Sequence, residues 1–128
     1  MNERVTIIDA DGGKSTVLPG GSCVRELISG PAAGAEHLCL GFSVWKPGTA
    51  TEQMVHEVEE AAYIVSGRGA LAVGGERIAY RAGQGVLIPA GVPHGVVNDS
   101  DEDLTMVYVF AHPEYPPTRS ATDEEKGA

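Results

Sequence analysis

From residue 35 onward, the chain is built of short runs in which apolar positions follow one another or alternate with polar ones. Glycine, proline and acidic residues separate these runs, and this rhythm is typical of β-strands joined by turns. The runs are HLCLGFSVW, AAYIV, ALAVGG, ERIAY, GVLIPAG, HGVVN and LTMVYVF. Seven or more strands at this spacing predict an all-β sandwich or barrel. The segment GGE at 74–76 lies between two of them and predicts a tight hairpin.

The two ends of the chain are less regular. The first 22 residues combine one short apolar run, VTIID, with the turn-forming segments DGG and PGGS. We therefore predict an N-terminal arm or edge strand over residues 1–19, followed by the barrel over residues 20–112. Residues 113–128 are rich in proline, charge and small polar side chains. We predict a disordered tail there, because the segment holds little apolar surface to bury.

Size and composition agree with a single β-rich domain. The chain has 128 residues, of which 42% are hydrophobic and 5% aromatic, with 17 glycines and 8 prolines, and so many turn-forming residues disfavour long helices. The net charge of −9 repels nucleic acids and anionic membranes, so we predict neither as a partner. The N-terminus lacks the pattern of a secretion signal, and no apolar run approaches the ~20 residues of a membrane span, so we expect a cytoplasmic protein.

The first of two spaced motifs holds candidate metal ligands. Gly48 is followed by five residues, then Met54, one residue, His56, three residues, Glu60, six residues and Gly67. Side chains two apart on a strand point to the same face, so Met54 and His56 look into one space.

The second motif follows in the C-terminal half. Gly83 is followed by five residues, then Pro89, Ala90, Gly91, two residues, His94, three residues and Asn98. The two blocks resemble the paired motifs of the cupin superfamily, G-x5-H-x-H-x3-E-x6-G and G-x5-P-x-G-x2-H-x3-N. Every fixed position of the second is present, and the first has one departure, at Met54.

The resemblance implies a double-stranded β-helix, the cupin jelly-roll barrel, with a mononuclear metal site inside it. Carried over by position, the ligands are His56, Glu60 and His94, with Met54 in the place of a further histidine. Two neutral imidazoles and one carboxylate suit Fe(II), and Mn, Ni or Zn also fit. The alternatives are that both histidines are core residues with hydrogen-bond partners and that Glu60 is a solvated charge beside its acidic neighbours.

Methionine at position 54 leaves two interpretations. A thioether is a soft, neutral donor that binds hard divalent ions weakly and favours Cu(I), so coordination by Met54 would indicate copper. The other interpretation is an apolar filler of the barrel mouth, a role that the flexible methionine side chain suits. We favour the filler, which leaves a three-residue site.

The resemblance implies two functions of different kinds. One is a metal-dependent enzyme acting on a small organic molecule, of dioxygenase, isomerase or lyase type, in which Glu52 and Tyr63 are the candidate catalytic residues. The other is a non-catalytic module that holds a small ligand or a metal. Tyr108 and His112 either hydrogen-bond a ligand or are ordinary packed side chains with a polar end.

Two further expectations remain open at this stage. Arg25 and Glu26 either reach the barrel mouth or form an exposed pair. The resemblance also implies a homodimer, because small cupins often pair through their barrel surfaces.

Overall fold

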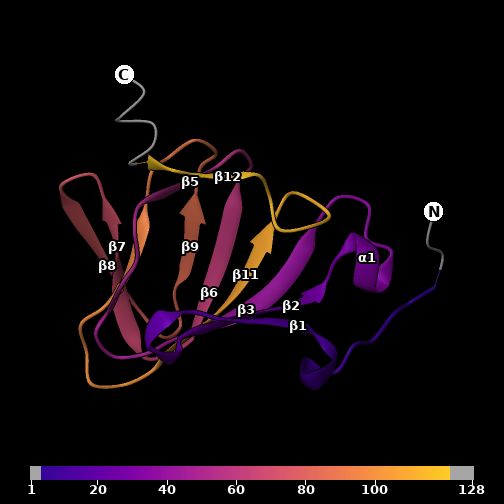
Figure 1. Cartoon of the computed structure of the whole chain (residues 1–128), viewed down its shortest axis with the longest axis horizontal. Coiled ribbons are helices and arrows are strands. Elements are labelled where there is room, and N and C mark those ends of the chain that lie inside the picture. The colour runs from indigo at the N-terminus through magenta and orange to yellow at the C-terminus, as the bar shows by residue number, and fades with distance from the viewer. Residues whose placement is uncertain (1–3, 122–128) are drawn as a thin grey trace.

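The computed structural model describes residues 4–121, and Figure 1 shows two antiparallel sheets with a strand pair across one end. The six-stranded sheet has the order β1 (Lys14–Val17), β2 (Cys23–Ile28), β3 (Cys39–Trp45), β11 (Leu104–Phe110), β6 (Glu60–Ser66) and β9 (Gly85–Ile88). The four-stranded sheet has the order β4 (Thr49–Ala50), β10 (Gly95–Asn98), β7 (Arg68–Val73) and β8 (Glu76–Arg81). The pair at the end of the barrel consists of β5 (Met54–His56) and β12 (Thr118–Ser120). The all-β prediction is confirmed.

Helical structure is limited to three short segments of the described chain. These are η1 (Ala10–Gly12), η2 (Pro19–Gly21) and α1 (Gly30–Ala33). Ser29 caps α1 by accepting a hydrogen bond from the amide of Ala32 at 3.1 Å, and Gly34 ends it in the left-handed conformation. Within residues 4–121, no helix is both long and apolar enough to cross a membrane.

The core lies between the two sheets, as strict alternation on the central strands requires. On β3 and β11 every second residue is buried, so one face of each strand points inward. The main cluster draws on both sheets and contains Trp45, Ile64, Leu71, Tyr80, Ile88, Val96, Leu104 and Met106. Burying each large apolar side chain contributes roughly 1.5–3 kcal/mol, so this cluster is the main stabilising contact between the sheets.

Two motif residues explain why the strands turn where they do. Gly67 has φ = 84°, and a Cβ atom there would collide with the carbonyl of Asp103, so only glycine fits between β6 and β7. The fully buried Asn98 donates from Nδ2 to the carbonyls of Trp45 and Glu102, both at 2.8 Å. It thereby connects β3, β10 and the turn before β11. The hairpin predicted at 74–76 is also present, since Val73 on β7 pairs with Glu76 on β8.

The segment after His112 differs from the prediction of a disordered tail. Residues 118–120 form β12, which pairs with β5 so that Thr118 lies opposite His56. The amide of Ala121 donates to the carbonyl of Gln53 at 3.0 Å, and Pro116 is buried. Backbone pairing with an available strand orders the segment, although its own sequence has little apolar surface. Residues 122–128 lie outside the described part of the chain. At the other end, β1 is the edge strand expected within residues 1–19.

Candidate metal centre

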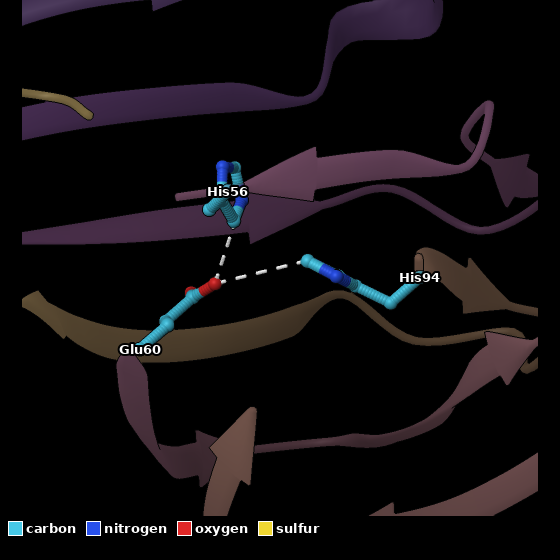
Figure 2. A group of neighbouring side chains, drawn as sticks. All are labelled: His56, Glu60 and His94. Atoms are coloured by element: carbon cyan, nitrogen blue, oxygen red, sulfur yellow. Dashed lines mark ion pairs between the residues drawn. The ribbon is translucent and has the colours of Figure 1, made fainter. Parts of the chain in front are cut away.

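Three side chains that lie on or next to strands of different sheets converge inside the barrel (Figure 2). His56 ends β5, Glu60 begins β6 and His94 directly precedes β10. Oε1 of Glu60 lies 3.6 Å from Nε2 of His56 and 3.8 Å from Nε2 of His94. One possible ligand atom from each residue lies within 4.8 Å of the other two. The predicted convergence is therefore confirmed.

Backbone hydrogen bonds hold the two histidines side by side. The amide of Met54 donates to the carbonyl of His94 at 2.8 Å, and the amide of His94 donates back at 3.0 Å. The amide of Gly91 donates to the carbonyl of His56 at 2.9 Å. The loop before β10 is thus bound to β5, which places the two imidazole rings with their centroids 5.0 Å apart.

Two aromatic rings pack against the site at His56. Phe110 on β11 contacts the ring of His56 edge to face at 4.9 Å, and Tyr115 contacts it from the C-terminal segment at 5.7 Å. The exposed fractions of His56 and His94 are 4% and 3%. The side chain of Glu60 is 12% exposed.

The outer hydrogen bonds fix which ring nitrogen of each histidine carries its proton. Nδ1 of His94 lies 2.9 Å from the carbonyl of Val92, which only accepts, so Nδ1 must donate. The hydroxyl of Thr118 donates to the carbonyl of Pro116 at 2.9 Å, so its oxygen accepts from Nδ1 of His56 at 2.8 Å. In the neutral state both rings then present the lone pair of Nε2 to Glu60.

When Glu60 is ionised, the centre of the site therefore holds three acceptors and no donor. The separations of 3.6 and 3.8 Å are too long for hydrogen bonds, so no proton is shared between the carboxyl and the rings. Two imidazole lone pairs and one carboxylate oxygen that face one another repel unless a cation lies among them. The donor set and its outer partners are consistent with a metal site.

Burial sets the protonation of the three groups. It lowers the pKa of His56 to about 4, with a smaller effect from nearby His94, and burial also lowers the pKa of His94. Both rings are neutral at pH 7, which is the form that binds metal ions. Burial raises the pKa of Glu60 to about 7, because no positive group of the described chain compensates its charge.

A cavity of about 980 Å³ adjoins the site. Its wall consists of residues from β1, β2 and the turn between them, the segment 45–54, β11 and the C-terminal segment. It includes Met54, Tyr115 and Thr118. Tyr115 and Thr118 both contact His56, and the backbone of Met54 is bonded to that of His94. The cavity thus reaches residues that contact the candidate ligands. Met54 lines it and His56 does not, so a space shared by these two side chains stays a prediction.

The remaining predicted residues lie in different places. Glu52 is exposed and lines the cavity, so its role in proton transfer stays a prediction. Tyr63 is 53% exposed on the outer face of β6, because it lies three positions from inward-pointing Glu60, and this place does not support a catalytic role. Tyr108 is buried and lines the cavity. His112 lies outside the cavity wall, where its ring meets the backbone of Glu114.

Two residues of the site were missed from the sequence. Tyr115 covers His56, and Thr118 orients it, and both lie in the segment predicted to be disordered. The only local signal is the alternation of polar and small residues over TRSA, which is too short to identify a strand. Their contribution depends on pairing with β5, about 60 residues earlier in the chain.

Comparison with known proteins places the chain in a family. Residues 41–110 match the family model described as Cupin domain. The chain belongs to the cupin family. It is 33% identical over 89 residues to polyketide synthase CurC of Streptomyces cyaneus, covering 69% of this chain and 58% of CurC. The chain thus spans less than two thirds of that relative's length.

Two further similar proteins agree with this assignment. SCO3923 of Streptomyces coelicolor is 37% identical over 78 residues, which cover 61% of this chain and 73% of SCO3923. The solved structure of polyketide cyclase RemF from Streptomyces resistomycificus superposes with a TM-score of 0.78, at 24% identity, over 91% of this cupin and 85% of RemF. The likeness to RemF shows the cupin fold.

Replacing Glu60 by glutamine in chelator-treated protein tests the environment of the carboxyl. The pKa of Glu60 is about 7 in the folded state, against an ordinary value of 4.5. Between these two pH values the folded state holds more protons than the unfolded state, so the contribution of Glu60 to the free energy of unfolding decreases as pH rises. Glutamine does not titrate, so we expect the stability of E60Q relative to the unsubstituted protein to rise by on the order of 3 kcal/mol between pH 4.5 and 7.5.

Urea denaturation at a series of pH values measures this difference. The contributions of His56 and His94 are present in both proteins and largely cancel. E59Q is the matched control, because it removes an exposed carboxylate from the same segment. A stability difference between E60Q and the unsubstituted protein that does not change with pH would contradict the burial of an uncompensated charge.

Proposed function

We propose that this cupin binds a divalent metal through His56, Glu60 and His94 and acts as an enzyme on a small organic molecule held in the adjoining cavity. The observation that carries the proposal is the set of three acceptor atoms facing one another beside a cavity of about 980 Å³. When bound, the metal supplies a Lewis acid that polarises a carbonyl or hydroxyl oxygen. Fe, Mn, Ni and Zn all suit the donor set, and Cu requires coordination by Met54.

The substrate class that we favour is a poly-β-ketone. The support comes from the relative CurC, whose name is polyketide synthase, and from a cavity lined by apolar residues such as Leu18, Val24 and Trp45. Ring closure of such a chain forms a carbon–carbon bond between a methylene and a carbonyl carbon. It moves a proton from the methylene to the carbonyl oxygen, and subsequent loss of water is a lyase-type step.

This chain's own residues hold and orient the reacting molecule in that scheme. The apolar wall excludes water, and Phe110 and Tyr115 restrict rotation of the His56 ring by packing against it. Glu52 at the cavity wall is the candidate proton carrier. A dioxygenase reaction is the alternative chemistry, and consumption of molecular oxygen distinguishes it from ring closure.

A non-catalytic binding module is the second candidate, and one observation favours it. The cavity wall contains Met54, Tyr115 and Thr118 but none of the three candidate ligands. If these residues keep a substrate from the centre, the metal has a structural role. Turnover, rather than binding, distinguishes the two functions.

A homodimer also stays a prediction. The outer face of the larger sheet exposes Tyr63 at 53%, Val65 at 49% and Leu87 at 62%, on the neighbouring strands β6 and β9. Apolar side chains grouped in this way are typical of an interaction surface. Light scattering measures the mass in solution, and we expect twice the chain mass for the unsubstituted protein and a smaller mass for L87E. A single chain mass at high protein concentration would contradict the prediction.

Substitution of Met54 tests the composition of the metal site. We expect M54L to retain one metal per chain, because the thioether contributes little affinity for hard divalent ions. M54H should bind the metal more tightly by adding an imidazole. H94A should lose more than the roughly 10- to 100-fold in affinity that removal of an outer hydrogen-bond partner costs. Metal stoichiometry by mass spectrometry and competition with a chelator measure all three. Loss of metal from M54L with the fold intact would make the sulfur a ligand.

Conversion of a poly-β-ketone tests the proposed reaction. An octaketide chain made in situ by a minimal polyketide synthase cyclises spontaneously to a mixture of products. We expect the metal-loaded protein to change the proportions of the ring products and H94A to leave the spontaneous mixture unchanged. M54L is the matched control, because it alters the cavity wall and keeps the three ligands. Chromatography that shows the same mixture with and without the loaded protein would contradict the reaction and favour the binding module.

A further inference from the structure

A second group of polar atoms lies in the cavity wall without hydrogen-bond partners. Within residues 4–121, Oε1 of Glu26 and the hydroxyl of Tyr108 are both buried and unpaired. Both residues line the cavity, and Tyr108 is only 4% exposed. A buried polar group without a partner is destabilising and needs an explanation in a folded protein. The mechanism above uses neither residue.

The strand register places these two residues in one row on the inner face of the sheet. Glu26 on β2 and Tyr108 on β11 are both opposite Gly41 on the intervening strand β3. A Cβ atom at Gly41 would collide with the hydroxyl oxygen and Cζ of Tyr108. The phenol end therefore lies over β3, in the space that a side chain at position 41 would fill. Its hydroxyl is directed toward the strand that carries Glu26.

The hydroxyl of Tyr80 is also buried and unpaired within the described residues, but Tyr80 does not line the cavity, and other polar groups of the cavity wall have partners. Trp45 also lines the cavity, but its indole N–H donates to Oγ of Ser43 at 2.9 Å, so it presents only apolar surface. Ser22 lines the cavity and is bonded to Thr49 at 3.0 Å. Lys14 is opposite Glu26 on β1, but it is exposed and forms no ion pair with Glu26 in the described chain.

We propose that Glu26 and Tyr108 bind the hydroxyl groups of a planar, hydroxylated ring or enol in the cavity, with the carboxylate of Glu26 accepting a hydrogen bond and the hydroxyl of Tyr108 donating one. The pair offers an acceptor and a donor on either side of a bare glycine, with the apolar residues Val24 and Trp45 also in the cavity wall. A ring with hydroxyl groups satisfies both polar atoms and covers the apolar surface. This inference rests on the proposed function in one respect, which is that the cavity holds an organic ligand.

Calorimetric titration of the protein as purified, whatever its metal content, with 1,3-dihydroxynaphthalene tests the assignment. We expect saturable binding to the unsubstituted protein, about fivefold weaker binding to Y108F and about tenfold weaker binding to E26Q, since hydrogen bonds to charged groups are the stronger ones. S15A is the matched control, because it removes an exposed hydroxyl from β1 outside the cavity wall and should leave affinity unchanged. The analogue 1,3-dimethoxynaphthalene lacks donors and should bind the unsubstituted protein and E26Q equally.

Thermal unfolding of the free proteins separates ligand binding from a structural role. Y108F removes an unpaired buried hydroxyl, so we expect its unfolding temperature to stay equal or to rise while its affinity for the probe falls. A structural hydroxyl would instead lower the unfolding temperature. Metal content measured on the same samples should be equal in Y108F, E26Q and the unsubstituted protein.

Three results would overturn the assignment. The first is absence of probe binding to the unsubstituted protein. The second is an affinity of Y108F and E26Q equal to that of the unsubstituted protein. The third is loss of affinity together with a lower unfolding temperature. None of these results tests metal binding, because metal stoichiometry and the role of the three candidate ligands are tested in separate experiments. Failure of metal binding or of ring closure would in turn contradict the proposed function and leave the probe result intact.

Discussion

The repulsion among three lone pairs in a closed site is the constraint on which the rest of this structure depends. His56 and His94 each use Nδ1 for an outer hydrogen bond, so each directs Nε2 at the carboxyl of Glu60. The rings of Phe110 and Tyr115 pack against His56 and partly cover the site. A folded protein compensates such an arrangement with a proton or a cation. Burial raises the pKa of Glu60 to about 7, which is the direction expected for a carboxyl group without a cation beside it.

The fold creates this arrangement through long-range backbone pairing rather than local sequence. β5 is only three residues long, yet it is bonded to β12 on one side and to the loop around His94 on the other. Each contact carries part of the site, because Thr118 orients His56 and the bridge to Met54 positions His94. Met54 and Thr118, which position the two histidines, also line the cavity and so form part of the wall that a ligand would contact.

The sequence predicted the features that depend on the spacing of residues along the chain. It did not predict features that depend on which face of a strand a side chain occupies or on pairing between distant strands. The strand pattern and the two motifs identified the barrel and the residues His56, Glu60 and His94, since fixed spacings determine which positions share a face. Tyr63 was predicted as catalytic, but its odd separation from Glu60 along β6 puts it on the outer surface of the sheet. Glu26 and Tyr108 lie on either side of Gly41 because of the strand register, which no local sequence pattern reveals. The order of the C-terminal segment likewise depends on β5.

Crystals of the protein grown with one divalent metal at a time, and measured on both sides of the absorption edge of that metal, test the central claim most directly. The account predicts one anomalous peak per chain within bonding distance of Nε2 of His56, Oε1 of Glu60 and Nε2 of His94, for at least one of Mn, Fe, Ni and Zn. Absence of a peak at this place with all four metals, while the three side chains keep the positions described above, would contradict it.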